Sequence, residues 1–309
     1  MFGNLDEIKT VFDFDDPTVY AIPLFLFFIG LELWIDVRRS MKLYHKKDAF
    51  SSIGMGLGSL VIGLGMKTLA FLVYRWIYYN FTIWPELKDY WWMWILLLFA
   101  DDFTFYWHHR LSHSVRILWA AHVNHHSSTH MNFATALRQS WAEVLYKYVW
   151  WIWLPFVGFH PVHIMTMMAF SLVYQFLQHT ELVKKLGPFE WIFNTPSHHR
   201  VHHATQTKYL DRNHAGILII WDRMFGTFQV EKEEDHPVYG ITNNIETYNL
   251  FKIASHEFIA IWHDVKRAPT FKDKLNYIFQ PPGWSHDGDL KTSNHLRKLE
   301  KMEKEKTAT

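Results

Sequence analysis

The chain has 309 residues, of which 49% are hydrophobic and 18% aromatic, so a disordered or collagen-like chain is excluded. Its 31 Lys and Arg residues nearly balance 30 Asp and Glu residues, which argues against a nucleic-acid-binding protein. The chain has no cysteine, which excludes disulfides and thiolate metal sites, but it has 21 histidines. Any transition-metal site must therefore be built from imidazole and carboxylate groups.

Five apolar stretches in the first 180 residues predict membrane helices. They are residues 18–35, 51–76, 90–107, 144–161 and 161–178. A bilayer core requires about 20 apolar residues per helix, and the last three stretches are at the lower limit of this length. The alternative for these three is that they are buried core helices of a soluble enzyme. We expect an all-α, integral-membrane helical bundle with four or five membrane helices, including a short re-entrant pair as one variant.

Basic residues indicate how these helices are oriented. The connection after the first stretch carries Arg38, Arg39, Lys42, Lys46 and Lys47. Such loops remain in the cytoplasm, whereas the turn at residues 157–163 has no Lys or Arg. Alternate crossings then place the ends of the third and fifth stretches on the cytoplasmic side. We expect a multi-pass membrane protein whose active site faces the cytoplasm.

The second apolar stretch contains Gly54, Gly56 and Gly58. Their spacing does not match the dinucleotide-binding pattern, and no strand is expected before them. Small residues spaced in this way allow close packing of membrane helices. The sequence therefore predicts no nicotinamide or flavin site, and a redox enzyme of this kind would need an external reductant.

Three histidine motifs and one further histidine follow the third and fifth stretches. They comprise His109 and His113; His122, His125 and His126; His199, His202 and His203; and His179. Positions i, i+3 and i+4 share one face of a helix, so each motif directs two or three imidazoles toward one point. A single zinc ion takes three or four ligands, so nine clustered histidines indicate two metal ions. They predict a helical, histidine-rich cap on the cytoplasmic side.

Asp102 lies on the same predicted helix face as His109 and His113. Metal-binding histidines usually donate their second N–H group to a carboxylate, a carbonyl or water. We therefore expect Asp102 to support a ligand histidine and count it among the catalytic residues. The alternative is that it marks a helix end at the membrane interface. His214 has no clear assignment from its spacing.

These motifs resemble the fatty acid hydroxylase/sterol desaturase superfamily of membrane di-iron enzymes, and within it the alkylglycerol monooxygenase-like proteins. The resemblance extends from about Trp91 to Trp284 and rests on residues 106–110, 122–128, 135–140, 178–181, 194–203 and 213–228. It implies iron ligands at His109, His113, His122, His125, His126, His179, His199, His202 and His203. Gln175 occupies a position where some fatty acid hydroxylases have another histidine.

The resemblance implies an O2-dependent monooxygenase that holds two iron ions and hydroxylates a lipid. An ether lipid is the first expectation, followed by a fatty acyl, sterol or amino-lipid chain. The two electrons would come from an external donor, either tetrahydrobiopterin or an electron-transfer protein. The alternatives are a lipid desaturase of the same superfamily, a histidine-rich metal transporter and a zinc hydrolase.

We expect three regions in the chain. Residues 1–90 would form N-terminal membrane helices, residues 91–230 the di-iron catalytic domain, and residues 231–309 a cytoplasmic-face segment with a charged tail. Residues 227–290 are expected to be irregular and polar, and the tail that begins at Leu296 is expected to be solvated surface.

Overall fold

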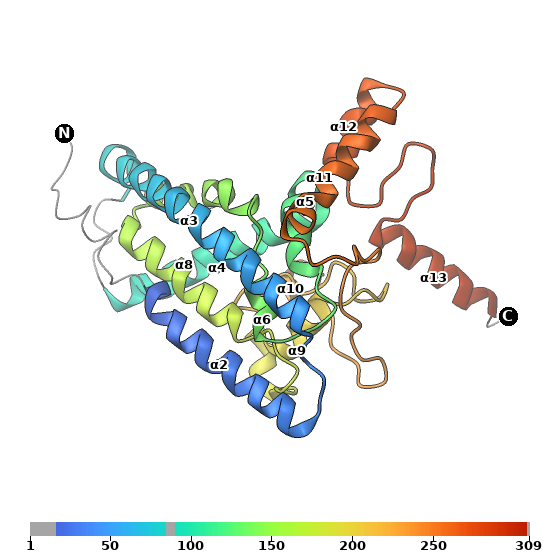
Figure 1. Ribbon diagram of the computed structural model, residues 1–309. Coiled ribbons are helices and arrows are strands. Elements are labelled where there is room, and N and C mark those ends of the chain that lie inside the picture. Colours follow the sequence, from blue (N-terminus) through green and yellow to red (C-terminus); the bar gives the residue numbers. More distant parts are fainter. Residues whose placement is uncertain (1–16, 85–89, 308–309) are drawn as a thin grey trace.

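The computed structural model describes residues 17–84 and 90–307, which are helical apart from loops and isolated β-bridges (Figure 1). The predicted all-α class is therefore confirmed. Residues 1–16 and 85–89 of the expected N-terminal region, and residues 308–309 of the tail, lie outside the described residues. The longer helices are α2 (Pro17–Arg39), α3 (Lys46–Phe81), α4 (Trp91–Ser114), α5 (Arg116–His126), α8 (Pro161–Phe176), α11 (Leu250–Arg267), α12 (Phe271–Phe279) and α13 (Ser293–Thr307). The short ones are α6 (Phe133–Ala136), η1 (Glu143–Leu145), η2 (Lys147–Trp151), α7 (Trp153–Val157), η3 (Gly187–Trp191), α9 (Pro196–His202) and α10 (Ile220–Met224).

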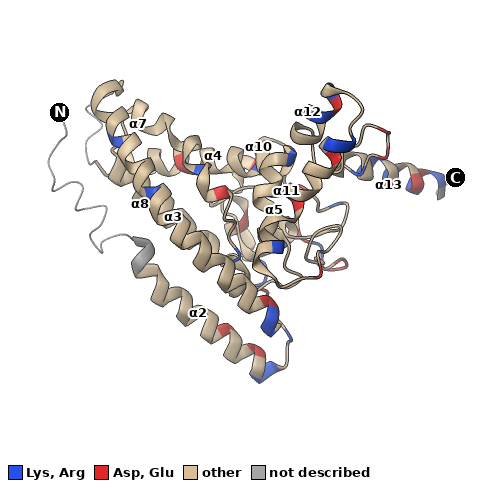
Figure 2. Ribbon diagram, turned by 45° about the horizontal axis from the view of Figure 1, so that its top comes forward, with Lys and Arg blue, Asp and Glu red and all other residues tan. Residues whose placement is uncertain are grey.

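Helix α8 lies at the centre of the apolar bundle, where it contacts α2, α3 and α4. Of the described helices, α2 and α3 are long and apolar enough to cross a membrane. Large apolar side chains on them are exposed, such as Leu26 at 64% and Val61 at 72%. Charged residues are sparse along the middle of α3 and gather near the connection to α2 (Figure 2). An apolar surface of this extent indicates that these helices face lipid.

The structure corrects the predicted membrane helix at residues 144–161. This segment consists of η1, η2 and α7, which pack against α3, with η2 also packing on α4. Pro155 removes a backbone donor, and Gly158 adopts a φ of 130°, so a continuous helix cannot form. The Trp151 indole donates to Asp101 Oδ1 at 2.7 Å, which holds the segment against α4. The other apolar stretches do form helices.

Glu32, the charged residue in the middle of α2, is buried and connects α2 to the loops beside the histidines. Its carboxylate accepts hydrogen bonds from the backbone N–H of Phe133 at 2.7 Å and from the hydroxyl of Tyr44 at 2.6 Å. It also accepts from the hydroxyl of Thr180, which follows His179. Because a buried carboxylate is stable only when its oxygens are satisfied, Glu32 fixes the position of these loops.

The glycines of α3 allow other segments to approach closely, as predicted, although their partners are not membrane helices. A Cβ atom on Gly56 would lie 2.5 Å from the backbone oxygen of Leu137. One on Gly58 would lie 2.4 Å from the indole of Trp141, which donates to a backbone oxygen of α3. The glycines therefore seat the loop after the second histidine motif directly on α3.

The expectation that residues 227–290 are irregular is wrong, because they include α11 and α12. Asn249 caps α11 by accepting from the N–H of Lys252, and Thr270 caps α12 by accepting from the N–H of Asp273. These helices project away from the apolar bundle (Figure 1), and α11 packs on α5. The tail helix α13 is not wholly solvated, since Arg297 donates to the carbonyl of Leu210 at 2.8 Å.

Candidate metal centre

The structure gathers all nine predicted histidines into two buried clusters. The first histidine cluster contains His109, His113, His122, His126 and His202. The second histidine cluster contains His125, His179, His199 and His203. In each cluster, one ring nitrogen of every member lies within 4.8 Å of the others. The helical spacing of the motifs explains this convergence, because α4, α5 and α9 each turn one face toward the centre.

The first histidine cluster has the hydrogen-bond pattern of a metal site. Nδ1 of His109 lies 2.8 Å from the carbonyl oxygen of His214, and Nδ1 of His202 lies 2.9 Å from that of Arg212. A carbonyl oxygen only accepts, so each Nδ1 carries the proton and each Nε2 presents a lone pair.

Carboxylates fix two further rings of this cluster in the same way. Nδ1 of His122 lies 3.0 Å from Glu143 Oε2, and Nδ1 of His113 lies 3.2 Å from Asp211 Oδ1. Because an ionised carboxylate accepts only, both histidines also direct an unprotonated Nε2 inward.

The inward-facing nitrogens approach one another closely. Nε2 of His109 and Nε2 of His122 are 3.1 Å apart, although both are acceptors. Among the described residues, Nε2 of His113 and Nε2 of His202 are buried without a hydrogen-bond partner. Two facing lone pairs repel each other, whereas a cation between them would bind both. The donor set therefore fits a metal ion that accepts imidazole ligands, such as iron or zinc.

The second histidine cluster has a similar arrangement. Nδ1 of His179 lies 2.8 Å from the carbonyl oxygen of Gln175, so its Nε2 also presents a lone pair. That Nε2 lies 2.9 Å from Nε2 of His199 and 3.1 Å from Nε2 of His125. The side-chain amide of Gln175 donates to Ser171 on its own helix.

Burial favours the neutral form of histidines in both clusters. It lowers the pKa of His126, His199 and His202 well below the usual value, and neighbouring imidazoles lower these pKa values further. Burial opposes ionisation of Glu143, but His122 and its hydrogen bond outweigh that effect and lower the pKa of Glu143 to about 2. Neutral imidazoles and an ionised carboxylate are the forms that metal binding requires.

Asp102 does not support a ligand histidine as expected. Its carboxylate accepts from the backbone N–H groups of Ile217 and Leu218, at 2.7 and 2.8 Å, and from the indole of Trp221 at 3.0 Å. The predicted position of Asp102 on its helix is correct. However, its carboxylate is occupied by hydrogen bonds from the loop that follows the third histidine motif. Asp102 therefore anchors this loop to α4.

Glu143 and Asp211 are the supporting carboxylates that sequence reasoning missed. A lone Glu beside an apolar segment was the available signal for Glu143. Asp211 gave none, because it is 98 positions away from His113. His214 is buried beside the first histidine cluster, with its ring centroid 5.0 Å from that of His113 and its Nδ1 without a partner among the described residues. His198 is buried outside both clusters, with Nε2 3.9 Å from a Glu190 oxygen.

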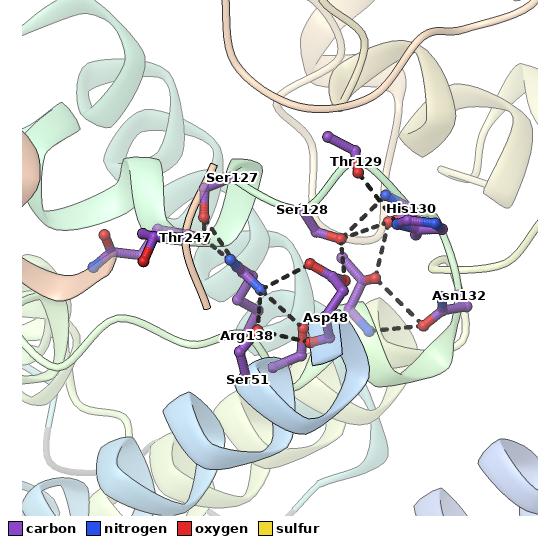
Figure 3. A network of polar contacts seen from close by, with 12 residues as sticks. Asp48, Ser51, Ser127, Ser128, Thr129, His130, Asn132, Arg138 and Thr247 are labelled. Carbon is purple, nitrogen blue, oxygen red and sulfur yellow. Dashed lines mark hydrogen bonds and ion pairs between the residues drawn. The ribbon is translucent and has the colours of Figure 1, made fainter. Parts of the chain in front are cut away.

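A buried ion pair holds the end of α5 in place (Figure 3). Arg138 Nε donates to the carbonyl oxygen of Asn124 at 3.1 Å and to Ser127 Oγ at 2.9 Å. Its Nη1 donates to Asp48 Oδ1 at 3.2 Å and to Ser51 Oγ at 2.9 Å, both on α3. Arg138 therefore connects the segment that carries His125 and His126 to the first turns of α3.

A comparison with known protein families identifies the same part of the chain. Residues 94–227, which include both clusters, match the family model for fatty acid hydroxylase. This part of the chain is therefore similar to the fatty acid hydroxylase family. The matched residues include every histidine of the two clusters, since the earliest is His109 and the last is His203.

The chain is also similar to curated proteins over more residues than the family model matches. The chain is 38% identical to an alkylglycerol monooxygenase of Xenopus tropicalis and 39% identical to that of Homo sapiens, over 92% of this chain in each case. It covers 63% and 62% of those proteins, so it spans about three fifths of their length. The ornithine lipid hydroxylase OlsE of Rhizobium tropici is 28% identical over 57% of this chain and 54% of its own length. No solved structure matches the chain.

Proposed function

We propose that this chain is a membrane di-iron oxygenase that hydroxylates a lipid. The observation that carries the proposal is the convergence of unprotonated Nε2 atoms in the first histidine cluster, such as those of His109 and His122. A second cluster of four histidines lies beside it, and both fall within the residues that match the fatty acid hydroxylase family.

Each cluster would hold one iron ion. Bound iron would supply O2 activation, with one oxygen atom entering a C–H bond and the other leaving as water after two electrons and two protons arrive. The chain itself orients the histidine rings and excludes water. Glu143 and Asp211 hold the rings of His122 and His113, and the apolar helices α2, α3 and α8 exclude water on the lipid side.

The names of the relatives support an ether lipid as the substrate class. Alkylglycerols are ether lipids, and an ornithine lipid is an amino lipid, so both named substrates have an alkyl or acyl chain beside a polar group. The same names favour hydroxylation over desaturation. Residues 91–230 would form the catalytic domain, residues 1–90 its membrane helices, and residues 231–309 a cytoplasmic-face segment.

The clusters would face the cytoplasm. Asn132, six residues after His126, donates to the carbonyl oxygen of Leu43 at 2.8 Å, which ties this loop to the basic connection between α2 and α3. Because basic loops remain on the cytoplasmic side, the contact supports a cytoplasmic active site in a multi-pass protein. A reductant from that compartment, either tetrahydrobiopterin or an electron-transfer protein, would then reach the clusters.

Metal content and oxygen incorporation together test the proposal. We expect about two iron ions per purified chain, because there are two clusters. The His125→Ala variant is expected to lose iron, while His263→Ala, which removes an exposed histidine of α11, retains it. An alkylglycerol supplied with labelled O2 and a reductant should gain one labelled oxygen atom.

Each other outcome has a defined meaning. Zinc in place of iron from iron-replete cells would contradict the oxygenase and favour a hydrolase. A chain without bound metal that transports metal across vesicles would favour a transporter. A product that has lost two hydrogens without gaining oxygen would identify a desaturase.

A further inference from the structure

The helices α11 and α12 each expose an apolar face on the side that points away from the protein. The inward side of α11 combines the buried Ile253 and Ile261 with Glu257 and Asp264, which bind Arg116 of α5 at 2.8 and 2.7 Å. On the opposite side, Phe251 is 75% exposed and Trp262 is 58% exposed. In a water-soluble domain, the side of an amphipathic helix that points away from the protein is polar. The outward face is therefore suited to an apolar environment.

Helix α12 continues this surface. Phe271, Leu275 and Phe279 recur every fourth residue, so they share one side of the helix, and all three are exposed. The opposite side holds the buried Tyr277, whose hydroxyl lies 2.7 Å from Nδ1 of His286. Two consecutive helices thus expose aromatic and aliphatic rows while burying their polar contacts. We call the exposed side of residues 250–279 the apolar face of the hairpin.

The apolar face of the hairpin adjoins the lipid-facing surface of α3. Leu250 packs on Gly54, where an added Cβ atom would lie 2.9 Å from its side chain. Phe50 and Leu57 lie on the same side of α3 as Gly54 by helical spacing, and they are 74% and 60% exposed. The exposed apolar surface therefore runs without a break from α3 onto α11.

The contact between Leu250 and Gly54 lies at the level expected for the edge of a bilayer. Helix α3 has 36 residues, which at about 1.5 Å per residue is about 54 Å, whereas the hydrocarbon core is about 30 Å thick. The excess places the first turns of α3, including Gly54, near the headgroups. Figure 1 shows the hairpin projecting sideways from the bundle rather than continuing along it.

The charges around the hairpin specify the kind of surface. The exposed basic side chains are Lys252, Lys266, Arg267, Lys272 and Lys274. Its carboxylates are engaged elsewhere, since Glu257 and Asp264 bind Arg116 and Asp273 bonds to the hydroxyl of Thr270. Lys266 also lies over the ring of Trp262, 4.5 Å from its centroid. An apolar row flanked by exposed cations matches acyl chains beneath anionic headgroups.

We propose that α11 and α12 form an amphipathic hairpin that lies in the anionic headgroup region of the bilayer, on the side where the histidine clusters are. The hairpin joins α5 through Arg116, and α5 carries His122, His125 and His126. Docking on lipid would therefore hold the second histidine motif at a fixed height above the membrane. This inference goes beyond the proposed chemistry, and it does not depend on which metal the clusters bind.

The cysteine-free chain allows a direct test in the intact chain of 309 residues. Single cysteines at Trp262→Cys and Leu275→Cys carry a fluorophore, and the protein is reconstituted in phosphatidylcholine vesicles that contain phosphatidylglycerol. Lys301→Cys on α13 is the matched control, because Lys301 is an exposed charged residue outside the hairpin. A metal content equal to that of the wild type, whichever metal is bound, shows that the labelled chains are folded.

We expect spin-labelled lipid to quench positions 262 and 275 several-fold more than position 301, and aqueous iodide to show the opposite order. Iodide quenching at 262 and 275 equal to that at 301 would overturn the proposal, because the face would then be in water. Protection from both quenchers would also overturn it, because a second copy or another protein would cover the face. Equal lipid quenching without phosphatidylglycerol would overturn the assignment to an anionic surface. A failure of the oxygenase proposal would appear instead as a wrong metal with this quenching pattern intact.

Discussion

Glu143 Oε2 lies 3.0 Å from Nδ1 of His122, and this contact makes Nε2 the inward-facing, unprotonated nitrogen of the ring. Glu143 is half-buried and also lies near His108, whose Nε2 is 3.8 Å from its other oxygen. One carboxylate thus faces two histidines, of which His122 belongs to the first histidine cluster. Its role is to position His122 rather than to touch substrate.

Replacement of Glu143 is therefore expected to weaken metal binding. Loss of a carboxylate partner of a metal-binding histidine typically lowers metal affinity about 10- to 100-fold, and we expect this for Glu143→Ala. Glu143→Gln retains an acceptor oxygen and should lose less. Competition with a chelator measures both affinities. An affinity for Glu143→Ala equal to that of wild type would contradict the positioning role.

The buried pair of Arg138 and Asp48 predicts a stability effect. Arg138→Met leaves Asp48 buried without its partner, which typically costs about 3–5 kcal/mol. The double variant Asp48→Asn, Arg138→Met should recover part of this loss, because no uncompensated charge remains. Lys185→Met is the control, because its 3.8 Å contact with Glu233 is exposed and such pairs contribute about 0–1 kcal/mol. Denaturant unfolding in detergent measures the free energies, and additive losses in the double variant would refute the coupling.

The packing of Gly56 predicts a position-specific effect on α3. Gly56→Ala would place a Cβ atom against the backbone oxygen of Leu137, and such overpacking costs about 1–3 kcal/mol. Gly63→Ala is the matched control on the same helix, because no atom lies within 4 Å of its added Cβ atom. We expect Gly63→Ala to be neutral or slightly stabilising, since alanine favours a helix. Thermal unfolding in detergent compares the two, and equal midpoints would show that the close approach carries no energy.

The tail helix should influence the first histidine cluster through Asp211. Ser293 on α13 donates to Asp211 Oδ2, while the other oxygen lies 3.2 Å from Nδ1 of His113. Asp211→Ala is expected to lower metal affinity about 10- to 100-fold, and Ser293→Ala should lower it less because Asp211 remains. Ser255→Ala on α11 removes a hydroxyl bonded to its own helix and serves as control. Chelator competition resolves the series, and an unchanged affinity in Asp211→Ala would disprove the link.

The nine clustered histidines could be predicted because the spacing within each motif is local. The expectation that each motif points to one site is wrong for the second and third motifs, whose rings are divided between the two clusters. Positions i, i+3 and i+4 determine which rings share a helix face, so His122, His125 and His126 were identified from spacing alone. The supporting groups could not be predicted in this way. Glu143 is 21 positions from His122 and Asp211 is 98 positions from His113, so both contacts depend on tertiary packing.

The fold was predictable to a similar extent. Long apolar stretches predicted α2 and α3, because length and composition alone decide whether a helix can span lipid. The error at residues 144–161 arose because mean hydropathy does not register the break at Pro155 and Gly158. The hairpin at residues 250–279 was missed because its polar side chains were assumed to face water, whereas Glu257 and Asp264 face α5.

The two histidine clusters are built from the same short helices. Helix α5 contributes His122 and His126 to the first cluster and His125 to the second, while α9 contributes His202 to the first and His199 to the second. The helical spacing within α5 and α9 thus sets the separation of the two sites. A change in either helix that alters one cluster also alters the other. A metal that orders α5 and α9 at one site prepares the neighbouring site, so occupancy should be cooperative and singly loaded chains should be scarce.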